Sequence, residues 1–172
     1  MSTDFEIGSQ FLNYCGARLE VLASWADDCL SRLSQEQLWW RPAEEQNAAG
    51  NLVLHLCGNL HQRITCPLSD GVPDNRNRDR EFDARSTATA QELRQLLKEN
   101  VVEALAALRQ FPAGRLLERA HIPHYDRSVL ENVFSVIEHF AQHTGQIIFI
   151  TKQLTSQELD YYPHLKRKKT AS

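Results

Sequence analysis

The sequence predicts an all-α protein built from four long helices. Only 7 glycines and 6 prolines occur in 172 residues, which disfavours a turn-rich β fold. Four segments repeat their apolar residues in steps of three and four, the period of an amphipathic helix. The length suits a single domain over 1–172 with a full-sized core, followed by a basic tail from about 165.

The first segment runs from about Phe5 to Leu33 and carries a seven-residue apolar repeat. The repeat consists of Leu12, Cys15, Leu19, Leu22, Ala26, Cys29 and Leu33. This pattern predicts a helix packed nearly parallel to its neighbours in a bundle. Ser34 and Gln37 then have the spacing of a capping box, which opens a short turn before Pro42.

The second segment runs from about Asn51 to Cys66 and is expected to end before Pro67. Its apolar side consists of Leu52, Val53, Leu56, Cys57, Leu60 and Ile64. The opposite side carries His55, Asn59 and Gln62, which form either a solvent-facing stripe or a polar seam lining a cavity between helices.

Gly58 lies beside these polar residues, in the interior of the second helix. A glycine there costs about 1 kcal/mol relative to alanine, so it indicates a close approach by another segment or a ligand.

A long polar linker, residues 69–87, separates the second helix from the third. Its central stretch, DNRNRDREFDARS, is dense in Asp, Asn and Arg and has almost nothing to bury. We therefore expect a surface excursion. A connection of this length is typical of a functional lid or a crossover.

The third helix opens with a capping box formed by Thr89 and Glu92 and runs to about Phe111. Pro112 and Gly114 then end it. Its apolar stripe consists of Leu93, Leu97, Val101, Ala104, Leu108 and Phe111.

The fourth helix opens with Ser128 and Glu131 and runs to about Leu154. Its apolar arc, which includes Phe134 and Phe140, spans more than half of the circumference and is wider than one core stripe needs. Such a helix is either central or covered by a second subunit, so we expect a homodimer.

Charge and composition exclude several classes of function. The net charge of -3 gives no basis for nucleic-acid affinity. Binding through the terminal KRKK run would fall steeply with salt, but such a run is usually only solvated. No apolar run is long enough to span a membrane. The start, MSTDFEIGSQ, lacks the features of a signal peptide, so we expect a cytoplasmic protein.

The four cysteines, Cys15, Cys29, Cys57 and Cys66, show no C-x-x-C spacing. In the cytoplasm their thiols should be reduced. We interpret the first three as small core hydrophobes rather than as ligands or nucleophiles.

The histidines are the candidates for chemistry. His139 and His143, in IEHFAQHTGQII, are four residues apart, about one helical turn, so both imidazoles project to the same side. With His55 they would offer three neutral nitrogens to one metal ion and leave a coordination position open. The spacing alone is weak support, and an ordinary bundle with structural or exposed histidines is the alternative. Phe140 stands where the glutamate of H-E-x-x-H would be, which excludes that class of zinc peptidase.

The remaining histidines are poorer candidates. His61 lies off the seam, His121 and His124 flank Pro123 in a loop, and His164 is near the tail. His121 and His124 could bind a metal, but we expect these two to face water.

Four blocks of the sequence together resemble the DinB-like superfamily, in an uncharacterised branch of it. They are LSQEQLWWRPAEEQNAAGNLVLHLCGNL, REFDARS, IEHFAQHTGQIIFITK and DYYPHL, and they cover nearly the whole chain. The resemblance implies an up-down-down-up four-helix bundle, often dimeric, with a divalent metal held by three histidines. These map onto His55, His139 and His143. Related families include thiol-dependent S-transferases and a mycothiol-dependent isomerase.

The leading hypothesis is a metal-dependent transferase that acts with a small thiol. A zinc or nickel ion on the three histidines would bind the thiol at its open position and lower the pKa of that thiol. Asn59, one turn from His55, is the candidate to orient a ligand or substrate, and Gln142 and Gln146 are weaker candidates. The alternatives are a metal-dependent hydrolase and a non-catalytic dimeric bundle that binds a metal or a small molecule.

The WWRP segment, which begins at Trp39 and Trp40 and continues with Arg41, could cap a pocket or seal the end of the bundle. We favour sealing, because aromatic pairs mostly serve burial.

Overall fold

The structure, a computed structural model, describes residues 3–162 and 164. The predicted basic tail from about 165 lies outside the described residues. Within the described part there is no strand, only two isolated bridges, and none of its helices is long and apolar enough to cross a membrane. The helices are α1 (Thr3–Arg32), α2 (Gln35–Leu38), α3 (Ala49–Leu60), α4 (Cys66–Leu68), α5 (Arg78–Asp83), α6 (Ala90–Gln110) and α7 (Val129–Thr155), with a π-helical turn at His61–Thr65 and a 3-10 turn at Ala113–Arg115.

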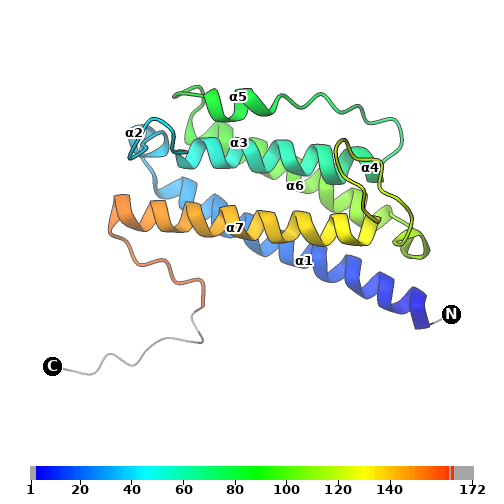
Figure 1. Cartoon of the computed structure of the whole chain (residues 1–172). Coiled ribbons are helices and arrows are strands. Elements are labelled where there is room, and N and C mark those ends of the chain that lie inside the picture. Colours follow the sequence, from blue (N-terminus) through cyan, green and yellow to red (C-terminus); the bar gives the residue numbers. More distant parts are fainter. Residues whose placement is uncertain (1–2, 163, 165–172) are drawn as a thin grey trace.

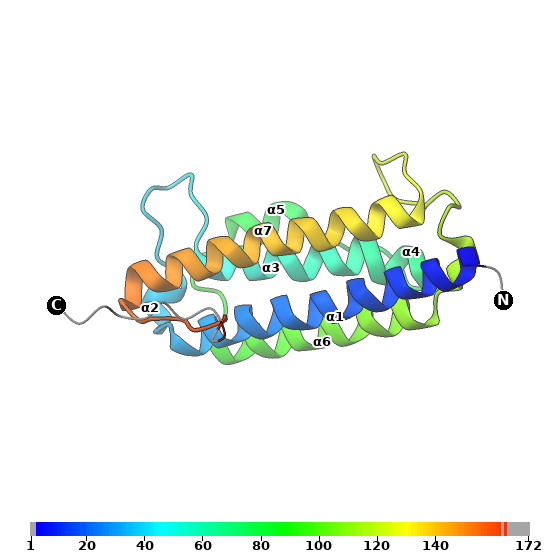
Figure 2. The same ribbon diagram turned by 90° about the horizontal axis from the view of Figure 1, so that it is seen from below.

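The four long helices, α1, α3, α6 and α7, surround one hydrophobic core (Figure 1). α1 packs against α6 and α7, and α3 packs against the same two helices, so α1 and α3 lie across the core from each other. Along the colours of Figure 1, α1 and α7 run in one direction and α3 and α6 in the other. The edge formed by α3 and α7 is therefore opposite the edge formed by α1 and α6 (Figure 2).

The predicted apolar stripes form the core. All seven residues of the α1 repeat are at most 6% exposed, and every residue of the predicted α6 stripe is buried. The three predicted capping boxes, which begin at Ser34, Thr89 and Ser128, are all present and fix where α2, α6 and α7 begin. The all-α prediction and the order of the long helices are thus confirmed.

The second long helix does not stop before Pro67, contrary to the prediction. A π-helical turn follows α3, in which the N–H of Cys66 donates to the carbonyl of His61, and α4 continues from there. Pro67 lies in the first turn of α4, and the carbonyl of Arg63, four residues before it, accepts instead from the side-chain amide of Asn132 at 2.6 Å. The helix can therefore pass through the proline.

The expectation that the linker buries almost nothing was wrong. The segment contains α5, which packs against α3, and it buries Glu81 (8% exposed) and the side chain of Arg76 (5% exposed). The two charges neutralise each other. Hydropathy scores each residue separately and therefore cannot predict that such a pair is buried. Asn51, fully buried on α3, holds the segment by donating to the carbonyls of Glu81 at 2.9 Å and Ala84 at 3.0 Å.

Trp39 seals the bundle, as predicted, but Trp40 does not. The indole N–H of Trp39 donates to the carbonyl of Ala88 at 2.9 Å, and its ring packs so closely on Gly50 that a Cβ there would lie 3.0 Å from it. Trp40 is 43% exposed. The guanidinium of Arg41 donates to the side chain of Asn51 at 3.0 Å, which ties this loop to the start of α3.

Candidate metal centre

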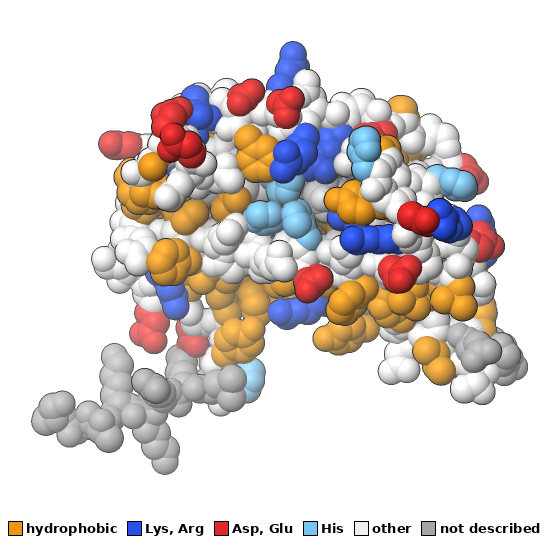
Figure 3. Space-filling model, viewed as in Figure 1, with side chains coloured by type: hydrophobic (Ala, Val, Ile, Leu, Met, Phe, Trp, Pro, Cys, Tyr) orange, Lys and Arg blue, Asp and Glu red, His pale blue; other side chains and the backbone are white. Residues whose placement is uncertain are grey.

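The structure brings the three predicted histidines together at the edge between α3 and α7. His55 projects from α3, and His139 and His143 project from successive turns of α7. Nε2 of His139 lies 3.1 Å from Nε2 of His55 and 3.1 Å from Nε2 of His143. The candidate ligand atoms of all three lie within 4.8 Å of one another. Figure 3 shows histidine side chains gathered near the middle of this face.

The partners of the imidazoles determine which nitrogens carry protons. Nδ1 of His55 lies 2.8 Å from a carboxylate oxygen of Glu81 and 3.1 Å from Nη2 of Arg76. The carboxylate only accepts and its contact is the shorter, so we assign this Nδ1 as a donor to Glu81. Nδ1 of His143 likewise donates to the amide oxygen of Gln146 at 2.6 Å. Both rings therefore turn an unprotonated Nε2 toward His139.

Burial keeps two of the three histidines, His139 and His143, neutral. Burial, with added repulsion from His143 and His55, lowers the pKa of His139 from 6.5 to about 3. Burial also lowers the pKa of His143. A neutral imidazole is the form that binds a metal, so His139 and His143 are in the ligand form at neutral pH.

The spacing of the three nitrogens fits a metal ion. In a tetrahedral site with metal–nitrogen distances of about 2.0–2.1 Å, neighbouring nitrogens are about 3.3 Å apart. The two contacts of 3.1 Å agree with this value. The three histidines could therefore hold a divalent ion.

Glu81 and Arg76 hold the first of these histidines in place. Nε and Nη2 of Arg76 donate to the two carboxylate oxygens of Glu81 at 2.7 and 2.8 Å, and Nη1 donates to Gln62 at 3.0 Å. Burial by itself would raise the pKa of Glu81, but the hydrogen bonds from Arg76 and His55 outweigh it and the pKa lies below its ordinary value. The carboxylate is thus ionised and orients the imidazole of His55.

Gly58 makes this arrangement possible, and its predicted close approach is confirmed. A Cβ at this position would collide with a carboxylate oxygen of Glu81 and lie 3.0 Å from Nε of Arg76. The linker can therefore reach His55 only because α3 has no side chain here.

The polar seam of α3 is buried, so the solvent-facing alternative was wrong for its first two members. His55 is 5% exposed and Asn59 is 6% exposed. Asn59 makes no hydrogen bond to a histidine, and its Oδ1 has no hydrogen-bond partner among the described residues. Of the three polar candidates, Gln146 is the one that contacts a histidine.

A groove of about 760 Å³ adjoins the cluster where Gln146 reaches His143. Its lining combines apolar side chains, amides and one carboxylate: Trp40, Pro42, Glu45, Gln46, Asn47, Leu52, Gln142, Gly145, Gln146, Phe149, Ile150 and Gln153. The loop that follows α2 projects beside it (Figure 2). The groove is large enough for a small organic molecule.

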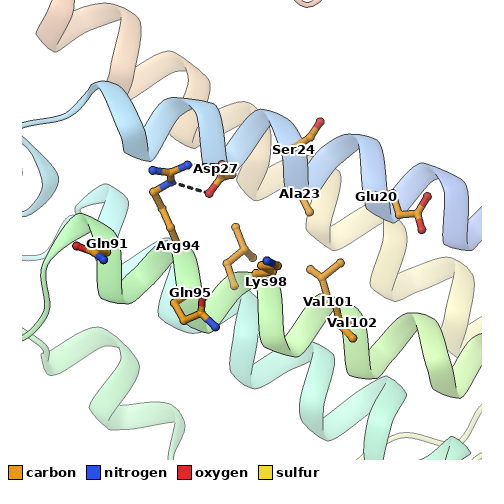
Figure 4. A pocket seen from close by; sticks show the side chains of 11 residues that line it. Glu20, Ala23, Ser24, Asp27, Gln91, Arg94, Gln95, Lys98, Val101 and Val102 are labelled. Carbon is orange, nitrogen blue, oxygen red and sulfur yellow. Dashed lines mark hydrogen bonds and ion pairs between the residues drawn. The ribbon is translucent and has the colours of Figure 1, made fainter.

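Another groove, of about 780 Å³, lies on the opposite edge between α1 and α6 (Figure 4). An ion pair between Arg94 and Asp27, at 2.7 Å, crosses it. None of its lining residues is a histidine.

The sequence did not reveal Glu81 and Arg76 as members of the site. Two signals pointed toward them: Gly58 on α3, and the N-cap of α5, where Asn77 accepts from the N–H of Arg80 at 3.2 Å. Neither signal identifies the partner, because the contact joins α3 to a segment more than twenty positions away.

The other histidines and the cysteines stay outside the cluster. His61 contacts the carbonyl of Pro73 at 3.1 Å, and no group of potential metal ligands found in the described part contains a cysteine. Burial raises the pKa of Cys57 to about 12, which makes it inert.

Comparison with known proteins identifies the family and the fold. Residues 6–163 match the family DUF1572, described as a protein of unknown function. The chain is similar in fold to a crystal structure of a conserved protein from Enterococcus faecalis, with 16% identity and a TM-score of 0.58 over 91% of this chain and 99% of the other. No curated protein matches. An all-helical chain with three converging histidines, matched over nearly its whole length, therefore belongs to DUF1572, a family of unknown function.

Proposed function

We propose that this protein binds one divalent metal ion, zinc or nickel, through His55, His139 and His143 and is a small-thiol-dependent transferase. The observation that carries the proposal is the convergence of three Nε2 atoms, with two contacts of 3.1 Å. A bound ion would supply an open coordination position at which a thiol loses its proton.

The charges around the cluster favour a thiol over water as the nucleophile. Among the described carboxylates, Glu81 is the one that touches the cluster, and it is engaged by Arg76 and by Nδ1 of His55. It orients a ligand and is not free to take a proton from water. A coordinated thiol needs no separate base, because coordination itself removes its proton. A hydrolase is the weaker alternative for this reason.

The groove beside His143 supplies the place for the second substrate. Its walls combine Trp40, Leu52 and Phe149 with amide side chains and one carboxylate, Glu45, which suits an organic group with an apolar part and no negative charge. Gln146 lines the groove and also holds Nδ1 of His143, so occupancy of the groove and orientation of a ligand are connected.

The wider assignment is part of the same proposal. We place the chain in the DinB-like superfamily as one up-down-down-up four-helix domain, supported by the helix directions in Figure 1 and by the site. We also place it in the cytoplasm, since all four of its cysteines are free thiols.

Metal analysis of purified protein tests the site. We expect about one ion per chain in the wild type and a loss of binding in His55→Ala and His139→Ala. His121→Ala is the matched control, because His121 is exposed and outside the cluster. Circular dichroism confirms that the variants fold. Full metal content in both folded site variants would refute the site.

A kinetic screen separates an enzyme from a metal-binding bundle. Metal-loaded protein is incubated with low-molecular-weight thiols and a panel of electrophiles, and loss of free thiol is followed. We expect turnover that a chelator abolishes and that added metal restores. Turnover that is unchanged after the metal is removed would rule out this mechanism, and no turnover with any pair would favour the bundle that only binds metal.

We further propose a homodimer that covers the outer face of α1 and α7. Large apolar side chains remain exposed there, with Phe134 59%, Ile7 61% and Tyr14 68% exposed. Figure 3 shows hydrophobic side chains gathered along this part of the surface. Contiguous apolar surface of this kind marks an interface, and a second copy is its simplest occupant.

A further inference from the structure

A buried arginine with no acidic partner lies in the same seam as the histidines. Arg63, in the π-helical turn after α3, is 5% exposed. Its guanidinium donates to Oδ1 of Asn132 at 3.2 and 3.1 Å and to the hydroxyl of Ser135 at 3.5 Å. No carboxylate in the described part of the chain forms an ion pair with it. A buried, unbalanced cation costs several kcal/mol, so its position needs a reason.

A second arginine converges on the same point. Nη1 of Arg127 donates to the hydroxyl of Ser135 at 2.7 Å. The ring of Tyr125 contacts both guanidinium groups, with its centre 4.4 Å from that of Arg63 and 4.8 Å from that of Arg127. The serine hydroxyl and the aromatic ring reduce the repulsion between the two cations but add no negative charge.

The two acidic groups nearest to Arg127 in the sequence are already engaged. The exposed Asp126, directly beside it, forms an ion pair with Arg119. The carboxylate of Glu131 accepts from the N–H and the hydroxyl of Ser128, both at 2.8 Å, in the capping box of α7. The pair of arginines therefore keeps its excess of positive charge.

The arginine pair lies close to the metal centre. Ser135 precedes His139 by four residues on α7, which places it about 6 Å along the helix axis. On the antiparallel α3, Asn59 lies one turn beyond His55, between the histidines and Arg63. Asn59 is 6% exposed, and its Oδ1 is a buried polar atom with no partner in the described part. Asn59 thus offers an unused hydrogen-bonding group between the three histidines and the arginine pair.

We propose that Arg63 and Arg127 bind the carboxylate or phosphate group of an anionic small molecule that also reaches the three-histidine centre. Guanidinium groups recognise both oxyanions with two parallel hydrogen bonds. Asn59 contacts the part of the ligand between the two ends. This inference deepens the proposed function and rests on it for the identity of the second end, while the oxyanion subsite itself needs no metal.

This arrangement predicts how the substrate lies along the edge between α3 and α7. The loop that carries Tyr125 and the loop that carries Trp40 project at opposite ends of the α3–α7 edge (Figure 2). The anionic group would lie at the Tyr125 end, and the groove beside Gln146, whose one charged lining residue is Glu45, lies at the other. The histidines stand between them.

Binding of inorganic phosphate to chelator-stripped protein tests the subsite. Thermal unfolding and titration calorimetry are run with sodium phosphate, with sodium acetate and with sodium chloride at matched ionic strength. We expect phosphate or acetate, whichever group the natural ligand carries, to raise the midpoint temperature above that in chloride. Arg63→Met and Arg127→Met should each weaken this binding at least tenfold.

Matched controls separate the subsite from general charge effects. Arg94→Met removes the same charge on the opposite edge and should leave phosphate and acetate binding unchanged. Arg127 is only partly buried, so its variant serves if Arg63→Met does not fold. Equal midpoints in phosphate, acetate and chloride for the wild type would overturn the inference. Binding that survives in the folded arginine variants would also overturn it and indicate an adventitious ion only.

The two proposals fail in different ways. His139→Ala should lose the metal ion and keep oxyanion binding, whereas Arg127→Met should lose oxyanion binding and keep the metal ion. A wild type that binds metal but neither oxyanion contradicts the subsite alone. A wild type that binds an oxyanion but no metal contradicts the metal site alone.

Discussion

Replacing Glu81 by glutamine tests whether the linker maintains the metal centre. The substitution keeps the size of the side chain but removes the negative charge that Nδ1 of His55 contacts at 2.8 Å. It also leaves the side chain of Arg76, which is 5% exposed, without its counter-charge. Both effects arise at the side chain of Glu81, which is about 9% exposed, so water cannot readily replace the lost interactions.

The magnitudes follow from these two losses. Removing a hydrogen-bond partner of a metal-binding histidine lowers metal affinity by about 10–100-fold, or about 1.4–2.7 kcal/mol. Removing one partner of a buried ion pair lowers the free energy of unfolding by about 3–5 kcal/mol. Release of α5 from α3 would limit the second cost, because Arg76 could then reach water.

Competition against a chromophoric chelator at pH 7.5 measures metal affinity, and urea unfolding of metal-free protein measures stability. The control is Glu44→Gln, since Glu44 contacts Arg85 at 2.9 Å but its side chain is 79% exposed. We expect the control to change neither quantity, because exposed ion pairs contribute little.

A folded Glu81→Gln protein with metal affinity within twofold of the wild type would refute the reasoning. The pH dependence gives a second check. Because the folded-state pKa of Glu81 lies below its ordinary value, its contribution to stability is present above pH 4.5 and is lost as the pH falls through the folded-state pKa. The variant should lack this part of the acid sensitivity.

Three further predictions use other features of the fold. Gly58→Ala should lower the free energy of unfolding by at least about 1 kcal/mol, because the added Cβ would meet Glu81. Gly145→Ala, which has open space around it, should raise the free energy of unfolding by about 0.5–1 kcal/mol. Urea unfolding measures both, and the reverse order of stabilities would contradict the packing. Metal-free protein should lose stability as the pH falls from 6.5 toward about 3, by at most about 1.4 kcal/mol per pH unit, because His139 is protonated in the unfolded chain but not in the folded one. Denaturation curves measured across this pH range check it. If the free energy of unfolding of His139→Gln falls with pH as steeply as that of the wild type, His139 is not the cause. Phe134→Glu should convert the proposed dimer to monomer in sedimentation velocity, and a monomeric wild type would end that proposal.

The helices were predictable because each carries its own local signals. The α1 repeat from Leu12 to Leu33 and the capping boxes at Thr89 and Ser128 depend only on residues a few positions apart. Pro67 misled the prediction because a π-helical turn depends on one hydrogen bond, from Cys66 to His61, that has no sequence signature.

The three-histidine cluster was predictable and its supporting residues were not. His139 and His143 share one helix, and His55 was a candidate from the polar seam of the second helix, which the resemblance to a known superfamily then strengthened. Glu81 and Arg76 lie in a segment whose composition is typical of a solvated loop, and their burial depends on each being the other's partner. Arg63 escaped notice for the same reason, since basic residues are rarely buried and hydropathy cannot show when one is.

The contacts of His55 have a consequence for how the chain holds together. This one side chain touches Glu81, 26 positions away, and His139, 84 positions away. Since all four cysteines are free thiols, an ion at this point would be a reversible cross-link that fastens α3, α5 and α7 to one another. Coupling of this kind is reciprocal: whatever tightens the hold on the ion also keeps α5 in place, and whatever lifts α5 loosens the ion. Protease resistance of the linker would therefore report metal loading from a site that the protease never reaches.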